Sequence, residues 1–152
     1  MEKHAKIFNI KLSVLNLSES IDWYRKVFKP LGFNEGWYFK NDPYDNGDTF
    51  AFGNDYFIIE MQEVPKNLQL NSFNPKRVGL SRIEIYSETK EQVDNFFEHL
   101  KTLNVDILKE PQYMYKEKPD HVNYEKGEKW YALHFCDPSG IIWVFLYTDW
   151  RL

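Results

Sequence analysis

The chain has 152 residues, of which 43% are hydrophobic and 18% aromatic, and its formal net charge is −4. This composition excludes a disordered chain, and the negative charge argues against a nucleic-acid-binding surface. No apolar run approaches the ~20 residues of a membrane-spanning helix, and the first residues lack the apolar stretch of a signal peptide. The only cysteine, Cys136, cannot form an internal disulfide, so we expect a cytoplasmic protein. From its charge and its lack of a long apolar run, we expect the protein to bind neither nucleic acid nor membrane.

The first part of the chain is expected to form a strand, a helix and a hairpin. Apolar and polar residues alternate over 8–14, which predicts a strand with one packed face. Apolar residues recur at helical spacing over 21–31, and Asn16 with Glu19 resembles a capping box, so a helix should follow. Residues 53–55, Gly-Asn-Asp, then separate two apolar runs, as in a β-hairpin.

The second part of the chain repeats this order. A strand is predicted over 80–87, and a helical apolar stripe follows over 93–103. Thr89 and Gln92 supply a second capping-box pattern at the beginning of this helix. A further hairpin is predicted around 137–140, Asp-Pro-Ser-Gly, because Asp, Pro and Gly suit the first, second and fourth positions of a type I turn.

The repeated order predicts a duplicated βαβββ unit within one domain spanning 1–152. We expect a module over 7–63 and a module over 79–148, joined by a Pro- and Asn-rich linker over 64–78. A polar segment over 110–129 interrupts the second module, and both a mobile lid and a plain surface excursion fit its composition.

Two sequence motifs agree with this repeat. The stretch "VLNLSESIDWYRKVFKPLGF" and the final hairpin "YALHFCDPSGIIWVF" resemble the vicinal oxygen chelate superfamily, which includes glyoxalase I, extradiol dioxygenases and bleomycin-resistance proteins. The resemblance implies an α+β fold, in which two tandem βαβββ modules form cupped mixed β-sheets with the helices outside. Because this fold serves many chemistries, the resemblance alone does not define an activity.

In the metalloenzymes of that superfamily, His and Glu side chains from the first and last strand of each module hold a divalent ion. The resemblance, with "IIEM" over 58–61 matched to "IIWV" over 141–144, places Asn9, Glu60, Arg82 and Trp143 at these positions. Arg82 repels a cation and the indole of Trp143 has no lone pair to donate, so only Glu60 suits a metal. We therefore expect no metal and no cofactor. A shifted metal site that uses His134 stays open, beside a hydrogen-bonded interior histidine.

The charged residues at these positions suggest what replaces the metal. We expect Glu60 to pair with Arg82, and Lys11 to pair with Glu84, in a cup that Trp143 helps to line. The alternative is that these charges only satisfy one another inside a filled barrel. The expected ligand-binding residues are Asn9, Lys11, Glu60, Arg82, Glu84, His134 and Trp143.

Three functions remain open at this point. The first is binding of a small organic molecule without a metal, as in the bleomycin-resistance branch. The second is a glyoxalase- or dioxygenase-type enzyme, with a shifted metal site or with Glu60 as the catalytic acid or base. The third is a protein-interaction domain that uses 110–129. Cys136 lies beside a turn Asp without an evident activating cation, which argues against a nucleophile. The resemblance also implies a homodimer.

Overall fold

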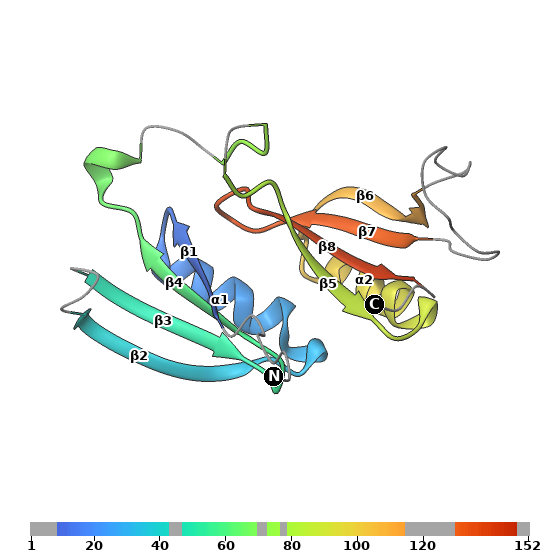
Figure 1. Cartoon of the computed structure of the whole chain (residues 1–152), viewed down its shortest axis with the longest axis horizontal. Coiled ribbons are helices and arrows are strands. Elements are labelled where there is room, and N and C mark those ends of the chain that lie inside the picture. Colours follow the sequence, from blue (N-terminus) through green and yellow to red (C-terminus); the bar gives the residue numbers. More distant parts are fainter. Residues whose placement is uncertain (1–8, 43–46, 70–72, 77–78, 115–129, 149–152) are drawn as a thin grey trace, which may run out of the picture. The chain divides into compact units, whose positions relative to one another are not determined.

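The chain folds as two compact units, Met1–Ser72 and Phe73–Leu152, whose boundary falls within the predicted linker. The computed structural model describes residues 9–42, 47–69, 73–76, 79–114 and 130–148. In this part of the chain, each unit contains one four-stranded mixed sheet and one α-helix on one of its faces (Figure 1). The predicted α+β architecture of two βαβββ modules is confirmed.

In the sheet of the first unit, the first and the last strand along the chain lie side by side. The strand order is β1-β4-β3-β2, with β1 parallel to β4 and the other neighbours antiparallel. The elements are β1 (Asn9–Val14), α1 (Leu17–Val27), the 3₁₀-helix η1 (Lys29–Leu31), β2 (Asn34–Asp42), β3 (Gly47–Gly53), β4 (Ile58–Glu63) and the 3₁₀-helix η2 (Lys66–Leu68).

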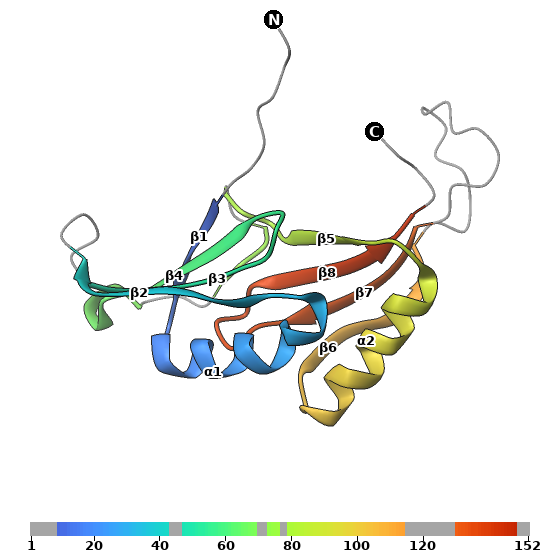
Figure 2. The same ribbon diagram turned by 90° about the horizontal axis from the view of Figure 1, so that it is seen from below.

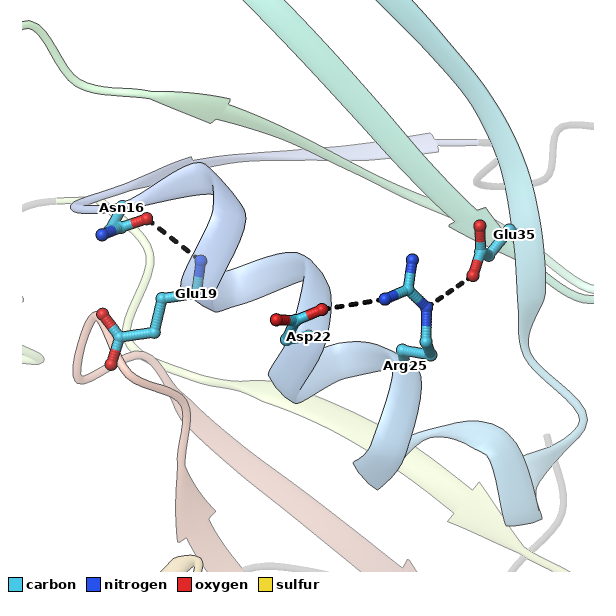
Figure 3. Close-up of polar contacts among 5 residues, drawn as sticks. All are labelled: Asn16, Glu19, Asp22, Arg25 and Glu35. Carbon is cyan, nitrogen blue, oxygen red and sulfur yellow. Dashed lines mark hydrogen bonds and ion pairs between the residues drawn. The ribbon is translucent and has the colours of Figure 1, made fainter.

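Helix α1 begins at the predicted cap, and an ion pair of Arg25 connects the helix to the sheet (Figure 3). The side-chain oxygen of Asn16 accepts a hydrogen bond from the Glu19 amide at 3.0 Å, which confirms the cap. In the last turn of α1, Arg25 donates to Asp22 at 2.8 Å and to Glu35 of β2 at 2.6 Å. These groups are about half exposed, so we expect the ion pairs to contribute at most about 1 kcal/mol each.

Aromatic rings join α1 to its sheet. Tyr24 is fully buried and stacks on Phe28 at 5.2 Å and on Phe52 of β3 at 6.3 Å between ring centroids. Phe52 lies opposite Ile59 of β4, which is also fully buried. The face of the sheet that carries Phe52 and Ile59 is therefore the one that packs against α1.

The second unit repeats the arrangement of the first (Figure 2). Its strand order is β5-β8-β7-β6, again with the first pair parallel and the others antiparallel. The elements are β5 (Ile83–Ser87), α2 (Lys90–Thr102), β6 (Asp106–Tyr113), β7 (Tyr131–Cys136) and β8 (Ile142–Tyr147).

Helix α2 also begins at its predicted cap. The Thr89 hydroxyl accepts a hydrogen bond from the Gln92 amide at 3.2 Å, and the Gln92 side chain accepts one from the Glu88 amide at 3.0 Å. Phe96 of α2 meets Phe135 of β7 and Phe145 of β8 edge to face, at 5.7 and 5.0 Å between centroids. These contacts identify the face of the second sheet that packs against α2.

The predicted turn over 137–140 is present between β7 and β8. The Gly140 amide donates to the Asp137 carbonyl at 2.9 Å, which closes the turn. The Asp137 side chain, itself buried, also accepts hydrogen bonds from the amides of Ser139 and Ile141. This double acceptance fixes the connection that leads into β8.

Strands β2 and β6 were not identified individually from the sequence. Strand β6 runs over Asp106–Tyr113 and so includes the first residues of the polar segment predicted over 110–129. That beginning is neither a lid nor a loop, and residues 115–129 lie outside the described part of the chain. Among the described residues, neither helix is long and apolar enough to span a membrane.

Candidate functional site

The residues expected to bind a ligand in the first unit lie on the face of the sheet opposite α1. Since side chains alternate along a strand, Glu60 points away from the face that carries Ile59. Lys11 lies opposite Glu60 across the β1–β4 pair, and Asn9 shares its side of β1. We call this surface the first helix-distal face; it carries Asn9, Lys11, Ser13, Ile58, Glu60 and Gln62.

Glu60 is the centre of a small polar network on this face. The Asn9 side-chain amide donates to Oε2 of Glu60 at 2.8 Å, and Lys11 Nζ donates to Oε1 at 3.0 Å. The Glu60 side chain is 13% exposed and that of Lys11 is 33% exposed. Both carboxylate oxygens of Glu60 therefore already accept a hydrogen bond from a donor on β1.

The second unit has an equivalent surface opposite α2. Glu84 lies opposite Val144 across the β5–β8 pair, and Val144 lies opposite His134 across the β7–β8 pair. Residues directly opposite each other point to the same side of a sheet. We call this surface the second helix-distal face; it carries Glu84, Tyr86, Ala132, His134, Val144 and Leu146.

Arg82 and Glu84 form an ion pair within the second unit, with Nε and Oε1 2.5 Å apart. Their side chains are 49% and 33% exposed, so solvent weakens the attraction. The pairs expected from the sequence, Glu60 with Arg82 and Lys11 with Glu84, join residues of different units and stay predictions. Within the units, Lys11 pairs with Glu60 and Arg82 pairs with Glu84.

Trp143, which we expected to line the ligand site, lies on the opposite face of its sheet. Trp143 lies opposite Ile83 and Phe135, and Phe135 contacts α2. Its side chain is therefore on the face that packs against α2, where it is completely buried. Phe145 and Tyr147 share this side of β8 by strand alternation. Trp143 is thus a core residue of the second module.

His134 does lie on the second helix-distal face, together with Ala132. The residue is only 8% exposed, and its Nδ1 has no hydrogen-bond partner among the described residues. Burial lowers the pKa of His134, and the positive charges of Lys109 and Arg82 lower this pKa further. Glu84 acts in the opposite direction but does not outweigh them. The imidazole is therefore neutral near pH 7.

Lys109 is a residue of this face that the sequence did not reveal. It lies opposite His134 across the β6–β7 pair, at a place where the register of β6 shifts on both sides. The irregular register breaks the alternation that would otherwise have shown which way Lys109 points. This register places Lys109 beside His134, and its charge lowers the pKa of the histidine.

Cys136 does not have the properties of a nucleophile. Burial raises the pKa of its thiol to about 11, and the charges of Asp106 and Asp137 act in the same direction. A thiol with such a pKa is almost entirely protonated at neutral pH, whereas the thiolate is the reactive form. Covalent catalysis through Cys136 is therefore disfavoured.

An open groove of about 470 Å³ lies elsewhere, on the α1 side of the first unit. The Tyr38 hydroxyl donates to Asp48, and this hydrogen bond lowers the pKa of the Asp48 carboxyl. Glu63 accepts from the Leu17 amide at 2.9 Å. The carboxylates of the groove thus bind groups of the protein itself. Its lining residues are Leu17, Ser18, Ile21, Tyr38, Asp48 and Glu63, none of which we expected in the site.

Comparison with known proteins agrees with the duplicated βαβββ architecture. The family model of the Glyoxalase/Bleomycin resistance protein/Dioxygenase superfamily matches residues 6–145. The chain belongs to this superfamily. No curated protein matches the sequence significantly.

Solved structures of the superfamily share the fold at low sequence identity. A glyoxylase/bleomycin resistance protein/dioxygenase domain from Frankia sp. EAN1pec has 15% identity and a TM-score of 0.73, covering 97% of this chain and 100% of that chain. A candidate glyoxalase from Bacillus halodurans has 20% identity and a TM-score of 0.69, covering 93% and 94%. The fosfomycin resistance protein FosX from Listeria monocytogenes, in complex with Mn(II) and sulfate, has 14% identity and a TM-score of 0.58, covering 97% and 93%. At these identities the likeness shows the fold alone.

The strand register corrects one of the superfamily positions. Glu60 lies opposite Lys11 in the first module, and Val144 lies opposite Glu84 in the second. Val144, not its neighbour Trp143, is therefore the counterpart of Glu60. The match of "IIEM" to "IIWV" was displaced by one residue, which moves a side chain to the other face of the sheet.

The residues at the four superfamily positions do not fit a divalent metal ion. After the correction these residues are Asn9, Glu60, Arg82 and Val144, which include one carboxylate, one permanent cation and one alkyl group. Divalent ions in proteins need several carboxylate, imidazole or thiolate ligands. Among the described residues, no three His, Cys, Asp or Glu side chains lie close enough together to share an ion. We therefore derive no reaction step through a metal.

Proposed function

We propose that this member of the superfamily binds a small organic molecule on its helix-distal faces and does so without a metal ion. The observation that carries the proposal is the set of residues on these faces. Asn9, Lys11 and Glu60 form a polar network on one face, and His134 lies with apolar residues on the other. Hydrogen-bonding groups beside apolar surface are typical of small-molecule sites.

The enzymatic alternative depends on Glu60 as an acid or base. Its carboxylate oxygens accept hydrogen bonds from Asn9 and Lys11. A general base must reach a proton of the substrate within hydrogen-bond distance. Each of these oxygens keeps a further lone pair for a substrate group, so the network is compatible with both roles, and binding stays the first proposal. By resemblance we also propose a homodimer, which sedimentation velocity at several protein concentrations would test.

A ligand screen tests the proposed function. The full-length protein is screened by thermal shift against small aromatic and charged molecules, with and without EDTA. We expect compounds that raise the melting temperature equally under both conditions, because binding to the native state stabilises it. Stabilisation that EDTA abolishes, or a screen without any stabilising compound, would overturn the proposal.

Variants then locate the site for any compound that binds. Glu60→Gln keeps the shape of the side chain but removes its charge, so we expect weaker binding. Asp55→Asn is the matched control, since Asp55 is an exposed residue of the β3–β4 connection. An equal effect of both substitutions would mean that overall charge, not the network around Glu60, determines affinity.

A further inference from the structure

Four side chains cross the second sheet in one row. Lys109 of β6 lies opposite His134 of β7, His134 opposite Val144 of β8, and Val144 opposite Glu84 of β5. All four therefore point to the helix-distal side. The row combines a cation, a neutral imidazole, an alkyl group and a carboxylate.

His134 is the most unusual member of this row. It is more than nine-tenths buried, and its Nδ1 has no hydrogen-bond partner in the described part of the chain. Buried polar groups in folded proteins nearly always have a partner, because a buried nitrogen without one loses its hydration and gains nothing in return. A ligand that offers a hydrogen bond to Nδ1 would supply this partner.

The charge around His134 determines which ligand fits. Glu84 is bound to Arg82, so these two charges largely offset each other. Lys109, the exposed neighbour of His134, makes no ion pair with any described residue. Within the part of the chain that the structure describes, the positive charge of Lys109 is therefore unpaired beside Nδ1, and an oxyanion could accept hydrogen bonds from both groups.

Apolar residues extend from this pair over the centre of the face. Ala132, Val144 and Leu146 form a buried cluster, and the half-buried side chains of Met114, Trp130 and Ile142 pack against it. Ala132 and Val144 are the neighbours of His134 along β7 and across β8. A ligand anchored at His134 and Lys109 would place its apolar body against the half-buried residues that cover this cluster.

We propose that Lys109 and the Nδ1–H of His134 bind the oxyanion of a small organic acid whose apolar part packs against the half-buried Met114, Trp130 and Ile142. This inference rests on the proposed function and defines its ligand as a carboxylate, phosphonate or phosphate. Neither a metal nor a residue of the first unit is required.

Titration with three related probes tests the proposal. The full-length protein, in buffer with EDTA and moderate salt, is titrated with benzoate, phenylphosphonate and the neutral benzamide. Dissociation constants come from chemical-shift changes, and the ring nitrogens of His134 are followed directly after ¹⁵N-histidine labelling. We expect at least one of the two acids to bind about tenfold or more tightly than benzamide and to shift the Nδ1 resonance of His134, as befits charge-assisted hydrogen bonds. The two acids distinguish a carboxylate from a phosphonate ligand.

Two pairs of variants separate the roles of Lys109 and His134. We expect Lys109→Met to weaken binding of the acid about fivefold to tenfold and to leave benzamide unaffected. Lys101→Met is its control, since Lys101 lies on α2 and pairs with Glu98. We expect His134→Phe to lose binding, and His134→Asn to retain most of it because the amide nitrogen of Asn lies close to the position of Nδ1.

The possible outcomes distinguish this proposal from the proposed function. If neutral and anionic probes bind equally well and Lys109→Met changes nothing, the oxyanion subsite is wrong while small-molecule binding stands. Equal losses in Lys109→Met and Lys101→Met would also refute it, because they indicate general electrostatic attraction. If none of these probes binds, and the broader ligand screen also finds no compound, both proposals fail together. Failure of these probes alone, beside successful binding of neutral compounds in the screen, overturns only the subsite.

Discussion

Val144 has the same place in the second sheet that Glu60 has in the first. Glu60 lies opposite Lys11 in the parallel pair of β1 and β4, and Val144 lies opposite Glu84 in the parallel pair of β5 and β8. The duplicated module therefore has a carboxylate in one copy and an alkyl group in the other. This difference places His134 next to an apolar residue instead of a second carboxylate.

The placement of Trp143 in the core predicts a large loss of stability on its truncation. Trp143→Ala should lower the free energy of unfolding by about 3–5 kcal/mol, because the ring is completely buried on the α2 side of β8. Trp37→Ala, at a half-buried tryptophan of the edge strand β2, should cost clearly less. Urea unfolding measures both. Equal losses would place Trp143 outside the core.

The lowered pKa of His134 predicts a pH dependence of stability. Because the folded state disfavours the imidazolium, the unfolded chain binds more protons from about pH 6.5 down to the folded-state pKa. The free energy of unfolding should therefore be at its full value above pH 6.5 and fall with pH through this window. The charges that bear on His134 are those of Lys109, Arg82 and Glu84.

A variant isolates this contribution of His134. Urea unfolding at pH 5 and pH 7.5 should show a larger loss of stability at the lower pH for the wild type than for His134→Gln, which does not titrate. Identical pH dependence in the two proteins would show that His134 can be protonated in the fold without cost.

The raised pKa of Cys136 predicts slow chemical modification. With a pKa of about 11 instead of the ordinary 9.0, its thiolate fraction at pH 8 is about 100-fold lower than that of a free thiol. Ellman's reagent should therefore react much more slowly with the folded protein than with the urea-unfolded chain. Comparable rates in both states would mean that the fold neither shields the Cys136 thiol nor raises its pKa, and would contradict this prediction.

The cap of α1 predicts a moderate effect at an exposed position. Asn16→Ala removes the acceptor of the Glu19 amide, so the free energy of unfolding should fall by about 0.5–2 kcal/mol (Figure 3). Ser18→Ala, within the first turn of α1, should change it by less than about 0.5 kcal/mol. If thermal and urea unfolding show no difference between these variants, the cap does not contribute to stability.

The helix caps and the final turn could be predicted from the sequence because their signals are local. Asn16, Thr89 and Asp137 each bond to amides within the next few residues, so spacing alone is informative. Strands β2 and β6 are edge strands with irregular register, and their side chains are mostly exposed. A regular alternation of apolar and polar residues, which identifies other strands, is therefore missing from them.

The side of β8 on which each residue lies could not be predicted for a different reason. The strand reads Ile-Trp-Val-Phe-Leu-Tyr, and both of its faces are largely buried. A strand that is apolar on both sides gives no period of two, so a displacement of one residue leaves no trace in the pattern. That is why Trp143 was assigned to the site in place of Val144. In β4, by contrast, burial alternates along the strand and so marks the side on which Glu60 lies.

Metal analysis of the purified protein tests the central claim most directly. The chain is expressed without a histidine tag in medium that contains zinc, nickel, iron and manganese, purified without chelator, and analysed by plasma mass spectrometry. The residues Asn9, Glu60, Arg82 and Val144 predict far less than one equivalent of any divalent metal per chain, since they offer one carboxylate and one permanent cation. A stoichiometric amount of any of these metals would contradict the account, and the enzymatic alternative with Glu60 and a shifted site at His134 would replace it.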